Sequence, residues 1–233
     1  MRIVVNDIAA SVGGAMTVLR DFYACVCEYG KEHEWIFLLN DRYFDERENV
    51  QIIVLDEIKK NPIKKVLFDF FTGKQFIEKL KPDVVFSMQN IITFGVKVPQ
   101  VVYVHQSLPF QHIKKFSLFK AEERSIAIKQ RIVGTIIKKS IKYADHVIVQ
   151  TMWMKTAICQ DCAIQAGKVT QCRPACLEMG NTAHPCELNP QSFYYPTSNG
   201  VYKNNQLVYD ASAILDAKGI RHRVELTIAP ENS

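Results

Sequence analysis

The sequence lacks several features that would assign a protein to a class directly. No stretch approaches about eighteen consecutive apolar residues, so no membrane-spanning helix is predicted. The N-terminus does not resemble a signal peptide, because only three apolar residues separate Arg2 from Asn6. Neither the G-x-G-x-x-G dinucleotide fingerprint nor the G-K-[ST] end of a P-loop is present, and no internal repeat is visible. Any ligand site therefore has to be sought in less regular motifs.

A cysteine pattern suited to disulfides is also missing. The 7 cysteines are an odd number, which without an export signal predicts reduced thiols and a cytoplasmic protein. The net charge of +5 is compatible with anionic ligands or an anionic membrane face, but it does not by itself indicate nucleic acid. A hydrophobic fraction of 48% with 23% charged residues is typical of a globular protein.

Short apolar runs alternate with longer amphipathic ones. Strands are predicted at residues 3–5, 35–39, 52–55, 84–87, 101–105 and 146–150. Helices are predicted between and after them at residues 14–29, 65–80, 122–143 and 152–166. Valine- and isoleucine-rich strands separated by helices indicate a parallel sheet that is covered on both faces. The predicted fold class is therefore α/β, with a Rossmann-like parallel sheet.

The alternation stops and then restarts. The stretch "CRPACLEMGNTAHPCELNPQS" is rich in proline and has little periodicity, so it is interpreted as a linker or hinge. A strand at 193–195, a helix at 204–218 and a strand at 224–228 follow. One β-α-β unit of about forty residues cannot bury its own core. The expected organisation is a domain over 1–172, a linker over 173–192, and the beginning of a second, incomplete Rossmann-like domain over 193–233.

A glycine pair lies between the first predicted strand and its helix. In an α/β sheet this loop faces the crevice where ligands bind. Gly13 and Gly14 have no Cβ atoms, so backbone N–H groups can approach a phosphate there, and the helix N-terminus adds partial positive charge. The alternative is that the pair only makes a tight turn.

Five stretches together resemble the group 1 (family 4) glycosyltransferases, which have the GT-B fold of two Rossmann-like domains. They occur in the family's order and cover about residues 1–170 and 193–217: "NDIAASVGGAMTVLRDF", "KPDVVFSMQN", "VPQVVYVHQSLPF", "ADHVIVQTMWMK" and "FYYPTSNGVYKNNQLVYDA". The resemblance implies transfer of a sugar from a nucleotide-sugar donor to an acceptor held by the N-terminal domain, with retention of anomeric configuration. It implies no cofactor and no bound metal ion.

The resemblance also implies roles for single residues. Gly13 and Gly14 match the loop that faces the donor diphosphate, and Lys203 in "YKNN" matches the lysine that holds the diphosphate. His105 matches the histidine near the donor sugar, and it is the predicted catalytic residue. A lysine and backbone amides suit the negative charge of a departing diphosphate.

Two departures from the family pattern bear on activity. Thr197 stands where the family usually has a basic residue, and the family's paired glutamates of the second domain have no counterpart before Ser233. A chain truncated within that domain would bind acceptor yet transfer poorly or not at all. The rival interpretation is accordingly a non-catalytic acceptor- or nucleotide-binding relative. A flavodoxin-like or response-regulator-like protein is less compatible with the linker and the restarted sheet.

Two amide side chains, Gln89 and Asn90, follow another predicted strand. Amides suit sugar hydroxyls because each offers donors and acceptors, so both are candidate acceptor-binding residues. The alternative is that they cap a polar loop. His105 itself has a similar alternative, a hydrogen-bonded histidine of the core.

The spacing of the cysteines admits a further interpretation. Cys159, Cys162, Cys172, Cys176 and Cys186 have a spacing superficially like that of zinc sites, but the first pair falls in a strongly helical stretch and is better explained as small buried side chains.

Residues 125–144 carry five basic residues and no acids, with isoleucines on one side of a helix. Such a helix either rests peripherally on the anionic inner face of the cell membrane or packs its apolar side on the sheet. The sequence as a whole predicts a cytoplasmic glycosyltransferase for a glycan or lipid-linked acceptor, in the synthesis of a surface polysaccharide or glycolipid.

Overall fold

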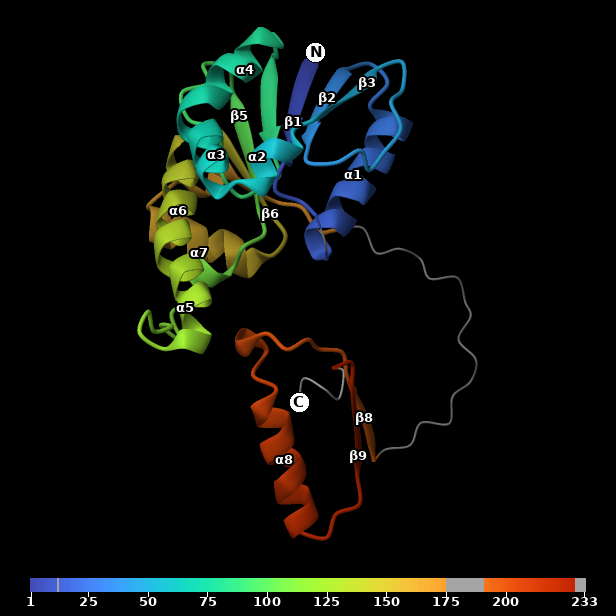
Figure 1. Ribbon diagram of the computed structural model, residues 1–233, viewed down its shortest axis with the longest axis vertical. Coiled ribbons are helices and arrows are strands. Elements are labelled where there is room, and N and C mark those ends of the chain that lie inside the picture. The colour runs from blue at the N-terminus through green and yellow to red at the C-terminus, as the bar shows by residue number, and fades with distance from the viewer. Residues whose placement is uncertain (12, 175–190, 229–233) are drawn as a thin grey trace. The chain divides into compact units, whose positions relative to one another are not determined.

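The computed structural model describes residues 1–11, 13–174 and 191–228 (Figure 1). The chain divides into two compact units, residues 1–118 with 125–176, and residues 119–124 with 177–233.

The first unit contains a seven-stranded parallel sheet in the order β3-β2-β1-β4-β5-β6-β7. The strands are β1 (Arg2–Asn6), β2 (Glu34–Leu39), β3 (Val50–Val54), β4 (Val84–Ser87), β5 (Gln100–Val104), β6 (His146–Val149) and β7 (Val169–Gln171). The predicted parallel sheet is confirmed, with β7 as an addition that is too short to show periodicity. The chain reverses its direction of travel between β1 and β4, and such switch points are where α/β sheets bind ligands.

Helices connect the strands of this unit except between β2 and β3 and between β4 and β5. They are α1 (Gly14–Tyr29), α2 (Asp56–Lys60), α3 (Pro62–Leu67), η1 (Phe68–Thr72), α4 (Gly73–Lys79), η2 (Leu108–Phe110), η3 (Lys129–Val133), α6 (Gly134–Tyr143), α7 (Met152–Cys162) and η4 (Ala166–Lys168). The helix α5 (Ala121–Ile128) begins in residues assigned to the second unit and ends in the first. The segments η1 and η3 are π-helical turns inside longer helices, and such turns often occur at functional sites.

The alternation of side chains along the strands divides the core into two faces. Val5 and Phe37 point to the face that α1 covers with Leu19. Val4, one residue earlier, points to the opposite face, where Phe68 of η1 and Ile77 of α4 pack. Because both faces are covered, the strands are apolar throughout, which is why the parallel sheet could be predicted.

The predicted helix at 122–143 is formed as α5, η3 and α6. Ile137 and Ile141 of α6 are 1% and 0% exposed and belong to the core beneath β5 and β6. The apolar side of this helix therefore packs on the sheet, and the lysines Lys139 and Lys142 are exposed. No helix in the described part of the chain is long and apolar enough to cross a membrane.

The second unit contains β8 (Ser192–Tyr195), η5 (Val201–Lys203), α8 (Gln206–Ala217) and β9 (Arg223–Leu226). The strands β8 and β9 pair in parallel, as one β-α-β unit requires. The restarted alternation of strand, helix and strand is thus confirmed. Most of the expected linker, residues 175–190, lies outside the described residues.

Candidate functional site

Three of the predicted site residues lie at the carboxyl edge of the sheet in the first unit. Gly13 and Gly14 join β1 to α1, and His105 directly follows β5. Gly13 has a φ of 70°, which an L side chain adopts only with strain, and its carbonyl accepts from the N–H groups of Met16 and Thr17 at 3.0 and 3.2 Å. A Cβ added to either glycine would meet nothing within 4 Å. Among the described residues, none therefore crowds the two glycines, and no side-chain hydrogen bond caps the N-terminus of α1.

Asn90 holds His105 in place. Its Oδ1 accepts from the backbone N–H groups of His105 and Gln106 at 2.8 and 2.9 Å. Its Nδ2 lies 3.2 Å from Nε2 of His105. These contacts link the ends of neighbouring strands β4 and β5, and Asn90 reaches them with a left-handed backbone at φ 67°. Two residues that the sequence marked for separate roles are thus hydrogen-bonded to each other.

The contacts of Asn90 define the protonation of the His105 ring. Because Oδ1 faces two N–H donors, the amide nitrogen must face the ring, and Nε2 of His105 accepts its hydrogen bond. The proton of the neutral ring is then on Nδ1. Burial lowers the pKa of His105, so the neutral form is favoured. A neutral imidazole that presents an N–H donor suits a sugar hydroxyl or carbonyl oxygen.

Replacing Asn90 by Asp is expected to raise the pKa of His105 above its ordinary value of 6.5, because a carboxylate oxygen beside Nε2 favours the imidazolium. An NMR titration of the ring protons measures this. Asn61→Asp adds the same charge at the N-cap of α3, where Asp caps as well as Asn, and is the matched control. An unchanged titration of His105 in Asn90→Asp would contradict the assigned hydrogen bond.

Gln89, the neighbour of Asn90, points elsewhere. It is 6% exposed, and its Nε2 donates to Oδ1 of Asp69 at 3.2 Å. The other oxygen of Asp69 accepts from Nζ of Lys65, four residues earlier along the helix. Burial raises the pKa of Asp69 and lowers that of Lys65, and their ion pair opposes both shifts. In the sequence, the i, i+4 spacing of Lys65 and Asp69 could have indicated an ion pair. It could not have indicated burial, because exposed ion pairs on helices have the same spacing.

Asp7 adds a third buried ionisable group at this edge. It follows β1, is 3% exposed, and its backbone N–H donates to the carbonyl of Leu38 at 3.0 Å. Burial raises the pKa of Asp7 to about 7, which the cations of Lys59 and Lys65 only partly oppose. The sequence offered no sign of this burial, because Asp after a strand is ordinarily a loop residue.

Lys203 lies in the second unit, in the loop between β8 and α8. Its carbonyl accepts from the hydroxyl of Tyr195 at 3.2 Å, and its Nζ lies 5.6 Å from the ring centroid of Tyr202. In the same loop, Oγ1 of Thr197 donates to Oδ1 of Asn205, the N-cap residue of α8, at 2.7 Å. The lysine is therefore placed in a strand-to-helix loop, the position that suits anions in α/β units.

The cysteines show no metal-binding arrangement where they are described. Cys159 and Cys162 lie on α7, where Cys162 is buried in the core and burial raises the pKa of its thiol. Cys172 is exposed, and Cys176 and Cys186 lie outside the described residues. Within residues 1–11, 13–174 and 191–228, no group of three or more His, Cys, Asp and Glu side chains could hold a metal ion.

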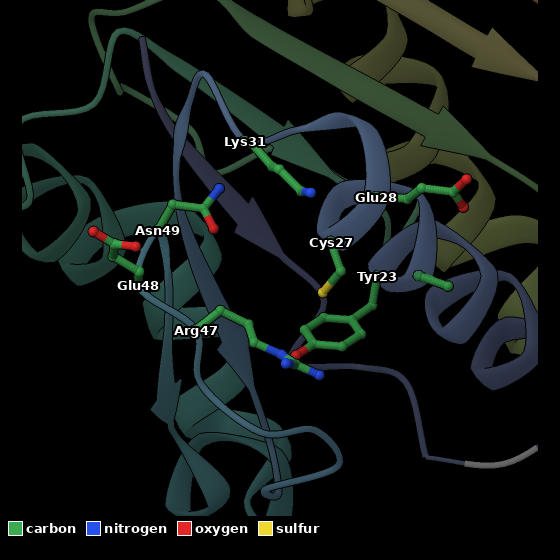
Figure 2. Close-up of a pocket in the computed structure, with 8 residues that line it drawn as sticks. Tyr23, Cys27, Glu28, Lys31, Arg47, Glu48 and Asn49 are labelled. Carbon is green, nitrogen blue, oxygen red and sulfur yellow. The ribbon is translucent and has the colours of Figure 1, made fainter.

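An open hollow of about 1020 Å³ lies at the edge formed by the amino ends of the strands (Figure 2). It is lined by the second half of α1 and by residues 47–49, which precede β3. Figure 2 shows Tyr23, Cys27 and Arg47 converging there. Because the amino end of β3 forms this edge, the hollow is separate from the loop of Gly13 and Gly14.

Comparisons with solved structures find proteins of similar fold. A glycosyltransferase from Rickettsia africae ESF-5 matches with a TM-score of 0.54 and 10% identity, over 99% of this chain and 69% of that chain. A UGT transferase from Siraitia grosvenorii, solved with UDP, matches with a TM-score of 0.51 and 9% identity, over 99% and 63%. A UDP-N-acetylglucosamine 2-epimerase from Rickettsia bellii matches with a TM-score of 0.51 and 11% identity, over 99% and 62%.

No family model and no curated protein matches the chain. The structural likeness defines the class of fold: a Rossmann-like α/β fold of the kind found in GT-B glycosyltransferases. The chain spans about two thirds of the length of the proteins it matches.

Proposed function

We propose that the protein is a glycosyltransferase of the group 1 (family 4) type, which transfers a sugar from a nucleotide-sugar donor to a glycan or lipid-linked acceptor with retention of configuration. The single observation that carries the proposal is that the glycine loop and the Asn90–His105 pair both lie at the carboxyl edge of a Rossmann-like sheet. Solved structures of similar fold are of a glycosyltransferase and of a UGT transferase in complex with UDP.

The proposed roles follow from the local chemistry. The N–H groups at the start of α1, beside Gly13 and Gly14, would bind the donor diphosphate and stabilise its charge as it departs. Lys203 would supply a second positive group to the diphosphate. His105 would donate a hydrogen bond from Nδ1 to the donor sugar, oriented by Asn90. Catalysis would then rest on positioning and charge stabilisation rather than on a bound metal ion.

The acceptor would be bound by the first unit. Asn90 is already occupied with His105, and Gln89 with Asp69. Both amides would thus act by shaping the site of the sugar acceptor. The Oε1 atom of Gln89 is buried and has no hydrogen-bond partner in the structure. This atom is expected to be satisfied by water or by an acceptor hydroxyl.

Gly14→Ala tests the diphosphate role, because its Cβ has open space and ordinary backbone angles. The thermal midpoint should be unchanged or slightly higher, since alanine favours helix. Affinity for UDP, measured by calorimetric titration, should fall about tenfold or more as the Cβ blocks close approach of phosphate. Gly167→Ala is the control, because that glycine is equally open and lies beside β7 at the amino edge.

Two outcomes would count against the proposal. One is equal stabilisation of the protein by UDP, pyrophosphate and sulfate, which would indicate a non-specific anion site. The other is unchanged UDP affinity in Gly14→Ala. Specific UDP binding without sugar release from any UDP-sugar, over a panel of acceptors, would instead support the non-catalytic relative.

A further inference from the structure

The outer side of the helix formed by α3 and η1 carries a stripe of exposed apolar side chains. Ile63, Val66, Leu67 and Phe71 are 71%, 51%, 45% and 64% exposed. Their spacing of three, four and eight residues from Ile63 puts them on one face of the helix. The inward side of the same helix is already packed, because Phe68 is 3% exposed in the core. The stripe is therefore additional to the core of the unit.

A row of aromatic rings joins this stripe to α6. Phe71 lies 6.5 Å from Phe70, which stacks on Phe94 at 4.7 Å between ring centroids. Phe94 in turn contacts Tyr143, the last residue of α6, edge-on at 6.2 Å. Tyr143 is 67% exposed, so the apolar surface continues from η1 to the end of α6.

Positive charge borders the aromatic row. The Nζ of Lys139 lies 5.7 Å from the ring centroid of Phe94 and 6.0 Å from that of Tyr143. Lys142 is exposed on the same helix, and α6 contains three lysines and no acidic residue. Since Ile137 and Ile141 face the core, the exposed side of α6 carries Lys139, Lys142 and Tyr143.

We propose that this docking face, made of Ile63, Val66, Leu67, Phe71 and Tyr143 with Lys139 and Lys142, binds the surface of an anionic lipid bilayer. The apolar stripe would enter the headgroup region, while the ammonium groups contact lipid phosphates. The helix at 125–144 therefore contributes charge, and the inserted residues come from α3 and η1 instead. The inference does not depend on the proposed sugar transfer.

The chemistry of the face favours a bilayer over a second copy of the chain. In a symmetric dimer the same patch meets its copy, so Lys139 and Lys142 would need acidic partners from the copy's docking face, and neither that face nor α6 contains an acid. An anionic membrane satisfies both the lysines and the apolar residues at once. With few inserted side chains, the binding would be reversible.

Co-sedimentation of the full chain with lipid vesicles tests this proposal. We expect binding to phosphatidylcholine vesicles that contain about one third phosphatidylglycerol, with weaker binding to pure phosphatidylcholine. The double variant Leu67→Ser with Phe71→Ser should lower the affinity about tenfold or more. Neutralising Lys139 and Lys142 to glutamine should cost about fivefold per lysine and reduce the salt dependence.

Tyr29→Ser is the matched control, because Tyr29 is 76% exposed at the end of α1, the helix that covers the opposite face of the sheet. It should leave vesicle binding unchanged. An equal loss in Tyr29→Ser, or unchanged binding in both docking-face variants, would overturn the proposal. The proposal would also be overturned if the wild-type protein did not bind vesicles but formed a dimer, and if Leu67→Ser with Phe71→Ser dissociated that dimer. If the apolar variant fails to fold, the lysine variant decides, and UDP titration of the same samples tests the transferase proposal separately.

Discussion

Replacing Asp69 by alanine is expected to destabilise the protein by about 3–5 kcal/mol, the largest effect predicted for a single substitution. The carboxylate is buried, with only 7% of its side chain exposed, and it is the partner of both Lys65 and Gln89. Its removal leaves a largely buried ammonium and a buried amide without their acceptor. Urea unfolding followed by circular dichroism measures the loss.

The chain provides a close control in the pair of Asp56 and Lys60. This pair has the same i, i+4 spacing but its side chains are 45% and 69% exposed. Asp56→Ala should leave the free energy of unfolding nearly unchanged, because solvent screens an exposed pair. The double variant Lys65→Met with Asp69→Leu should recover most of the stability lost in Asp69→Ala, since an apolar pair leaves no unpaired charge. Similar losses in Asp56→Ala and Asp69→Ala would refute the buried pair.

Asp7→Asn is expected to stabilise the protein at alkaline pH. Burial raises the pKa of Asp7 from 3.8 to about 7, so the folded state holds a proton that the unfolded state releases. Between these values the unfolded state binds fewer protons, and the free energy of unfolding falls as pH rises. At about 1.4 kcal/mol per pKa unit, ionised Asp7 costs the fold about 4 kcal/mol above pH 7, a cost that the neutral amide lacks.

The measurement is a pair of urea titrations at about pH 4 and about pH 8 for both proteins. The gain from Asp7→Asn should be several kcal/mol larger at the higher pH. Asp69 also titrates with a raised pKa, but it is present in both proteins, so the difference between them reports Asp7. If the gain in free energy of unfolding from Asp7→Asn did not vary with pH, the pKa of Asp7 would not be raised in the folded state.

The parallel sheet could be predicted because its cause is local. Runs such as "IVV" and "VIV" are apolar without alternation, which parallel strands covered on both faces require, and amphipathic segments separate them. Carboxyl ends of parallel strands share one edge, so the placement of Gly13 and His105 at that edge followed from their positions in the chain. β7 was missed because its three residues carry no periodic signal.

The partners of these residues depended on which strands are neighbours. Asn90 contacts His105 because β4 and β5 are neighbours in the sheet. Gln89, which follows β4, contacts Asp69 because η1 packs on the face of the sheet that includes Val4 and Val85. Local sequence specified neither contact, since each joins segments at least fifteen residues apart. The roles proposed for Gly13, Gly14, His105 and Lys203 remain predictions for the titrations described above.

Amino-acid order alone determined where most strands and helices fall, because backbone preference and the period of burial are properties of short segments. Only tertiary packing decided which side of a helix is covered and which charge is buried. Ile137 and Ile141 of α6 are buried in the core while Ile63 of α3 is exposed, although both segments mix lysine with apolar residues. That choice is made by the shape of the sheet beneath each helix, which no short stretch of sequence encodes.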